Sequence, residues 1–152
     1  LVVLTMATQK KMGLSVTAVS SIRRNFDKIK NSVKEKKDLP EEVNNAIQKF
    51  GEKFKILEKD IRPTGFMSLN SLEDTLRGGK VSTMLLLLGM SLGGFPFEPT
   101  ETDLSKFQEL SDHVEVLVQR LNDFMKEEIP LLNKVLKDVG LKTLRAPKQV
   151  KL

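Results

Sequence analysis

The chain has 152 residues and a mass of 17.1 kDa, a size that suits one domain with its own core. It contains no cysteine, one histidine and no tryptophan or tyrosine, which excludes disulfides, thiolate metal sites and cysteine nucleophiles. The net charge is +5, and residues 1–60 hold 13 Lys and Arg against 8 Asp and Glu, so the basic excess lies in the first part of the chain.

Two amphipathic helices are predicted before residue 62. Apolar residues at spacings of mostly three and four predict a first helix over about residues 5–37: Met12, Val19, Ile22, Phe26, Ile29 and Val33. The same spacing predicts a second helix over about residues 41–61: Val43, Ile47, Phe50, Phe54, Leu57 and Ile61. The connection between them is short, so we expect an antiparallel hairpin.

A third segment is apolar on nearly every side. A short helix that opens near Ser71 is interrupted at Gly78 and Gly79, and the leucine-rich residues 81–92 follow. Because a helix that is apolar all round is buried centrally, three of its leucines are expected in the centre of the bundle: Leu85, Leu88 and Leu92. The most apolar run, from Met84 to Phe95, would span about 18 Å as a helix, too short for the ~30 Å of a membrane core.

A long last helix is predicted to begin at a Thr100 cap with an acidic first turn. Its apolar stripe has ten members: Phe107, Leu110, Val114, Leu117, Leu121, Phe124, Ile129, Leu132, Leu136 and Val139. Pro130 predicts a kink, and Gly140 is expected to cap the C-terminal end. Residues 141–152 contain four basic and no acidic residues, and we expect them to form a basic tail docked through Leu141 and Leu144.

The predicted fold class is therefore all-α. The architecture is a four-helix bundle with long amphipathic helices and a short, broken, buried third helix. Residues 1–140 form a single helical-bundle domain, and residues 141–152 form the basic C-terminal tail. The sequence begins with Leu1 rather than Met, which is typical of a fragment or a processed piece.

Two possible sites of chemistry fail on their spacing. Gly79-Lys80 is followed by Val81 where a phosphate-binding loop needs Ser or Thr, so we interpret it as a helix break. His113 and Glu109 could face one direction, but they lack the Glu-x-x-His spacing of bundle di-metal sites. We predict no catalytic, cofactor-binding or metal-ligating residue, and no cofactor.

The first helix is densely basic near its end, at Lys28, Lys30, Lys34, Lys36 and Lys37. A basic helix can bind phosphates or an anionic membrane surface. A solvated helix face is the interpretation that we favour, because no aromatic residues are interleaved for base stacking. We expect weak, salt-sensitive binding to polyanions at most, and no specific nucleic acid.

Several stretches taken in order resemble a known module: Gln9-Lys10-Lys11-Met12 with Val19 and Ile22-Arg23, Leu69-Asn70-Ser71-Leu72, Met84 to Gly89, Pro99-Thr100, and Ile129-Pro130-Leu131-Leu132-Asn133 with Leu136 and Gly140-Leu141. Over most of residues 8–141 the chain resembles the helical C-terminal region of large bacterial proteins with sortilin-like, Asp-box-repeat β-propellers, commonly described as glycosyl hydrolase-like. The chain departs from that pattern in its Lys-Thr-Leu-Arg tail and in lacking the propeller.

The resemblance implies a non-catalytic accessory or interaction domain of an exported protein, periplasmic or extracellular. Its partner would be the β-propeller of the parent chain, a second copy of itself, or both. The presumed active surface of that family lies on the propeller, so the resemblance assigns no catalytic residue here. The sequence leaves open a stand-alone self-assembling or adaptor subunit, a weak anion-binding module using the first helix, and an enzyme with its site inside the bundle.

Overall fold

The computed structural model describes residues 2–61, 98 and 100–151, and all regular structure within them is helical. The helices are α1 (Val2–Glu35), α2 (Glu41–Ile61) and α5 (Glu101–Asp138). The all-α fold class is confirmed, α2 has the expected bounds, and α1 begins and ends slightly earlier than expected. The predicted third helix of residues 81–92, with Leu85, Leu88 and Leu92, lies outside the described residues.

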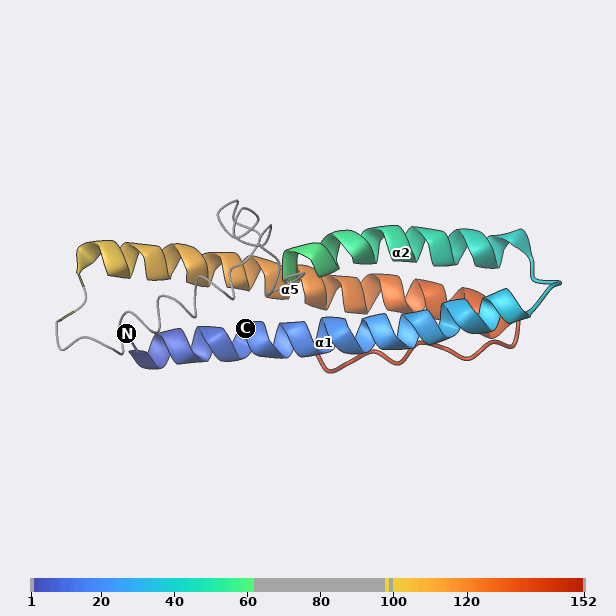
Figure 1. Ribbon diagram of the computed structural model, residues 1–152, viewed down its shortest axis with the longest axis horizontal. Coiled ribbons are helices and arrows are strands. Elements are labelled where there is room, and N and C mark those ends of the chain that lie inside the picture. Colours follow the sequence, from blue (N-terminus) through green and yellow to red (C-terminus); the bar gives the residue numbers. More distant parts are fainter. Residues whose placement is uncertain (1, 62–97, 99, 152) are drawn as a thin grey trace, which may run out of the picture.

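The three described helices form an elongated bundle in which each helix packs against the other two (Figure 1). α1 and α5 run in the same direction, and α2 runs antiparallel to both (Figure 1). With 21 residues α2 is about 31 Å long, whereas the 38 residues of α5 span about 57 Å. The N-terminal halves of α1 and α5 therefore continue past the end of α2, beyond the ion pair of Arg120 with Asp60.

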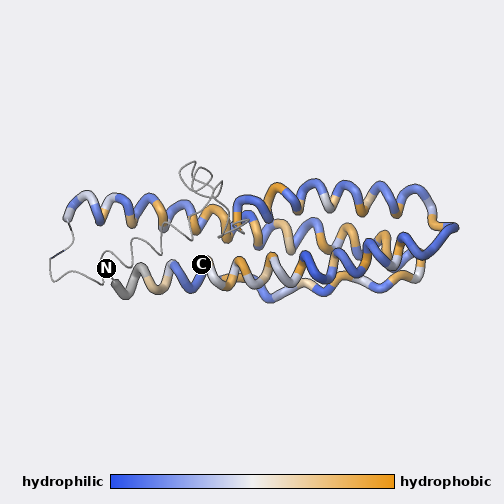
Figure 2. Tube along the Cα trace, viewed as in Figure 1, coloured by the Kyte–Doolittle hydropathy of each residue, from blue (hydrophilic) through white to orange (hydrophobic). Residues whose placement is uncertain are grey.

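The apolar stripes predicted from the sequence face inward. Figure 2 shows hydrophobic residues along the inner sides of the helices and hydrophilic residues outside. Every stripe residue is buried except four that are half-buried: Val33, Ile47, Leu110 and Val139. The core is thus one continuous cluster to which all three helices contribute side chains.

Four phenylalanines meet where the three helices are all present. The ring of Phe50 lies 4.8 Å from Phe26 and 5.1 Å from Phe124, and Phe54 lies 5.7 Å from Phe124, measured between ring centroids. These distances fall in the range that favours tilted aromatic pairs. The aromatic cluster therefore ties α1, α2 and α5 together in the half of the bundle that also holds the C-terminal segment.

The N-terminal end of α5 is closed as the sequence predicts. Thr100 is the N-cap, and its hydroxyl accepts a hydrogen bond from the Asp103 backbone N–H at 3.2 Å. The Asp103 carboxylate accepts in return from the Thr100 backbone N–H at 2.9 Å, which completes a capping box. α5 continues through Pro130, which is exposed, so the backbone position without a donor lies on the solvent side.

Candidate functional site

The candidate site depends on how the chain reverses after α5. Gly140 has φ of 71°, and its backbone N–H donates to the Lys137 carbonyl oxygen at 3.1 Å. The Leu141 N–H donates to the Leu136 carbonyl oxygen at 2.9 Å. This pair of bonds is the Schellman motif, which ends the helix and turns the following residues back along it.

Two asparagines of α5 hold the returning segment. The Asn133 side chain accepts from the Leu144 N–H at 2.7 Å and donates to the Leu144 carbonyl oxygen at 2.8 Å. Asn122 makes the same two bonds with Val150, at 3.0 and 2.8 Å. Because residue 144 pairs with 133 and residue 150 with 122, the segment runs antiparallel to α5.

The segment has a period of three. Leu141, Leu144 and Val150 are buried, Pro147 is half-buried, and the residues between them are exposed. A polyproline II strand has three residues per turn and rises 3.1 Å per residue. From Leu144 to Val150, six residues of such a strand would span about 19 Å. Their partners Asn133 and Asn122 are eleven residues apart on α5, or roughly 16 Å along the helix. The similar lengths are consistent with an extended segment. Docking through Leu141 and Leu144 is confirmed, and Val150 is a third anchor that the sequence pattern did not predict.

A groove of about 790 Å³ lies between α1 and the C-terminal segment. Residues of α1 form one wall: Ser21, Asn25, Lys28, Ile29, Ser32 and Val33. Residues of the segment form the other wall: Leu141, Lys142, Thr143, Arg145, Ala146 and Pro147. The volume is within the range of small-ligand sites, and the lining combines hydroxyl, amide and apolar groups.

The groove has a positive electrostatic character. Its lining includes three cations, Lys28, Lys142 and Arg145, and none of its described lining residues is acidic. The ion pairs within the described ranges engage other cations, namely Lys11, Arg23, Lys53 and Arg120. The charges of Lys28, Lys142 and Arg145 are therefore available to an anion from outside.

The predicted basic cluster of the first helix is divided by the fold. Lys28 lines the groove, whereas the Lys30 ammonium lies 5.8 Å from the centroid of the Phe26 ring. The other members, Lys34, Lys36 and Lys37, are exposed at and after the end of α1. Lys142 and Arg145, from the opposite end of the sequence, line the same groove as Lys28. The basic composition of the two segments did not predict that they would meet.

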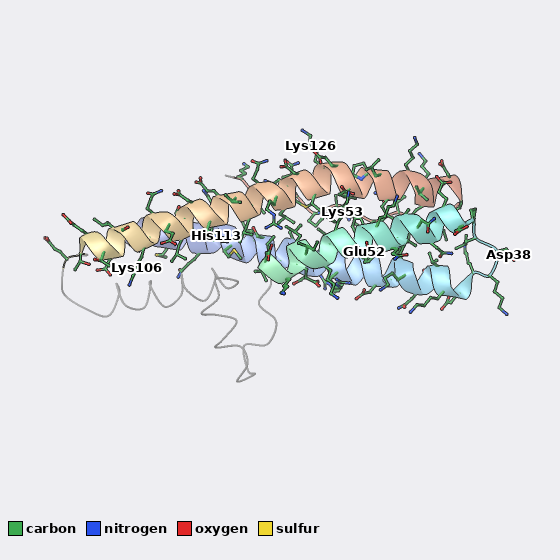
Figure 3. All side chains as sticks on the ribbon, turned by 90° about the horizontal axis from the view of Figure 1, so that it is seen from above. Asp38, Glu52, Lys53, Lys106, His113 and Lys126 are labelled. Atoms are coloured by element: carbon green, nitrogen blue, oxygen red, sulfur yellow. The ribbon has the colours of Figure 1, made fainter. Side chains whose placement is uncertain are left out.

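The other candidates stay apart from this groove. His113 lies on α5 (Figure 3), and both it and Glu109 are exposed. Gly79 and Lys80 lie outside the described residues. In the part of the chain that the structure describes, no group of three or more His, Asp and Glu side chains is arranged to hold a metal ion.

The best-formed ion pair of the bundle is structural. Arg23 donates to both Glu58 oxygens at 2.8 Å, from Nε and Nη2, and a further contact reaches Asp27 at 3.3 Å. Its guanidinium also lies 4.9 Å from the centroid of the Phe54 ring. These hydrogen bonds, chiefly that to Glu58, raise the pKa of Arg23, so the pair fixes α1 against α2 in its charged form.

Comparison with known proteins adds no relative. No known family profile, no curated protein and no solved structure matches this sequence. Across the described helices, none is both long and apolar enough to cross a membrane.

Proposed function

We propose that this chain is a non-catalytic helical interaction domain, and that it binds an acidic partner in the groove between α1 and the C-terminal segment. The observation that supports this proposal best is the meeting of Lys28, Lys142 and Arg145 on one groove without an acidic lining residue. The helix α1 and the segment bonded to Asn133 hold the backbones of these residues in place, so binding an anion orders their side chains but not the backbone.

The form of the groove favours a partner that brings both charge and apolar surface. Ile29, Val33, Leu141, Ala146 and Pro147 lie beside the cations. A partner surface with carboxylates flanked by small apolar side chains would satisfy both parts of this lining. Exposed charge pairs contribute little individually, so the affinity should be modest and should fall with salt.

The proposal is tested with poly-L-glutamate as the probe and two charge-matched variants. The first variant replaces Lys28, Lys142 and Arg145 by glutamine. The second replaces Lys59, Lys106 and Lys126, which are exposed and lie outside the groove (Figure 3 labels the last two). Both lose three positive charges. We expect the groove variant to bind about tenfold more weakly than the control variant at low salt. Equal weakening of both variants would show that binding follows net charge alone, and would overturn the proposal.

The resemblance to propeller-bearing bacterial proteins supplies a context for this proposal. In that context the domain is an accessory to a β-propeller of the same polypeptide, in an exported protein, and the propeller would provide the acidic surface. The test is the reading frame upstream of residue 1. Repeated Ser-x-Asp-x-Gly-x-x-Trp blades there would support the context, and an upstream sequence without them would contradict it.

The four-helix form of the bundle is part of the same proposal. Residues 81–92 are apolar nearly all round, and we assign them to a buried helix beside the three described ones. Replacing Leu88 by alanine should then lower the free energy of unfolding by about 2–5 kcal/mol. A change within about 0.5 kcal/mol, typical of an exposed site, would contradict this assignment.

Self-association is the alternative that the exposed apolar side chains favour. Six large ones lie on the outer surface of the described helices: Met6, Leu14, Ile56, Leu104, Val116 and Leu131. Sedimentation of the purified chain distinguishes the two cases. A dimer that dissociates when Leu104 and Val116 are replaced by serine would support self-association, and a monomer at every concentration would contradict it.

A further inference from the structure

The four basic residues of the C-terminal segment share one register. They are Lys142, Arg145, Lys148 and Lys151, each three residues after the last. The buried and half-buried residues of the segment, at 141, 144, 147 and 150, have the same period and precede the basic residues by one position. All four basic residues are exposed. A strand with three residues per turn places every third side chain on one face, so the cations form a line beside the buried line.

We call this line of charge the basic ladder; its members recur every third residue. The period of three in burial fits a polyproline II strand, in which residues three apart are separated by about 9 Å. The two asparagine contacts, at Leu144 and Val150, hold the strand to α5 along this length. Lys142 and Arg145 also line the groove, opposite Lys28. The ladder therefore begins in the groove and continues along the segment.

We propose that the basic ladder recognises an extended acidic peptide that carries a carboxylate at every third residue, an inference that rests on the proposed function. A polyproline II peptide repeats its side chains every three residues, about 9 Å apart, which matches the period of the ladder one to one. Charges on a duplex are far denser, about one per 1.7 Å of axis, so a nucleic acid gains nothing from this spacing. The apolar groove residues beside Lys142 and Arg145 then accommodate the small side chains between the carboxylates.

The test uses two terminally blocked peptides of identical composition. One is four repeats of Asp-Ala-Pro, with an acid at every third residue. The other is two repeats of Asp-Asp-Ala-Pro-Ala-Pro, in which the acids are clustered. The protein is used as the intact chain and as a register variant that exchanges two alternate pairs: Lys142→Thr with Thr143→Lys, and Lys148→Gln with Gln149→Lys. The four cations then stand at 143, 145, 149 and 151 and no longer recur every third residue. The variant keeps the composition and net charge, and every exchanged residue is exposed, so folding should be unaffected.

We expect the intact chain to bind the periodic peptide about threefold to tenfold more tightly than the clustered one, and the register variant to lose this preference. Equal affinity of the intact chain for both peptides would overturn the ladder while leaving the groove proposal standing. Absence of binding to either peptide, together with no effect of the Lys28, Lys142 and Arg145 substitutions, would overturn both. Tighter binding of a 12-base-pair duplex than of the periodic peptide at physiological salt would make the ligand a nucleic acid and also overturn the ladder.

Discussion

At the scale of single residues, two glycines allow the effect of backbone conformation on stability to be measured apart from the effect of packing. Gly13 lies inside α1, and Gly140 ends α5 with φ of 71°. A Cβ built at either position meets nothing within 4 Å. Any difference between alanine substitutions at the two sites therefore reflects the backbone conformation rather than crowding.

We predict opposite effects for these substitutions. Gly13→Ala should raise the free energy of unfolding by about 0.5–1 kcal/mol, because alanine restricts the unfolded chain and favours a helix. Gly140→Ala should lower it by about 1–2 kcal/mol, because an L residue is strained at positive φ. Urea unfolding of the two variants checks both signs. A neutral Gly140→Ala would contradict the role of this residue in turning the chain back.

The capping box of α5 includes a carboxyl, that of Asp103, whose pKa is shifted in the folded protein. Hydrogen bonds from the Thr100 backbone N–H, and then from its hydroxyl, lower the pKa of Asp103. A carboxyl whose pKa is lower in the folded state stabilises that state above its unfolded pKa. This contribution disappears as the pH falls through the folded pKa.

Stability should therefore decline in acid partly through this group. We predict that Asp103→Asn lowers the unfolding free energy at pH 6, and that the gap between the two proteins narrows towards pH 2. Equilibrium unfolding over that pH range, with a direct NMR titration of the Asp103 carboxyl, provides the measurement. A gap that does not change with pH would show that the carboxylate charge contributes nothing to the cap.

At the scale of elements, the C-terminal segment depends on two side chains. Removing the Asn133 amide leaves both backbone groups of Leu144 without their partner, which costs about 1–3 kcal/mol when such groups are buried. We predict that Asn133→Ala accelerates amide hydrogen exchange at Leu144 and that Asn122→Ala does so at Val150. Gln119→Ala, on the same helix and bonded to Asp123, is the control and should leave both amides protected. Unchanged exchange at Leu144 in Asn133→Ala would contradict the role of the asparagines in holding the segment to α5.

The helices can be predicted from local sequence, whereas the hydrogen bonds that hold the C-terminal segment to Asn133 and Asn122 cannot. The period of Val43, Phe50, Phe54 and Leu57 fixes both the face and the length of α2 because helical burial repeats every three to four residues. The two ends of α5 can also be predicted locally, because Thr100 is a preferred N-cap residue and Gly140 a preferred residue just after a helix. These hydrogen bonds join residues that are far apart in sequence, by 11 positions for Asn133 and Leu144 and by 28 for Asn122 and Val150. No sequence pattern distinguishes such an asparagine from one that faces solvent.

At the scale of the whole molecule, the groove is a product of chain reversal. Lys28 was recognisable as part of a basic helix, and Lys142 and Arg145 as part of a basic tail. Their meeting requires α1 and α5 to run in the same direction, and the Gly140 turn to bring the segment back against α1 (Figure 1). No periodicity within either segment encodes that arrangement, so the site is visible only once the elements are placed.

Mapping of the bound peptide on the intact chain tests the central claim most directly. The periodic Asp-Ala-Pro peptide is titrated into uniformly ¹⁵N-labelled protein, and amide chemical-shift changes are followed residue by residue. The largest changes should fall on the two walls of the groove, at Lys28 and Ser32 of α1 and at Lys142, Thr143 and Arg145 of the segment. Changes centred instead on the exposed lysines of α2, or spread evenly over all basic residues, would contradict a binding site in this groove.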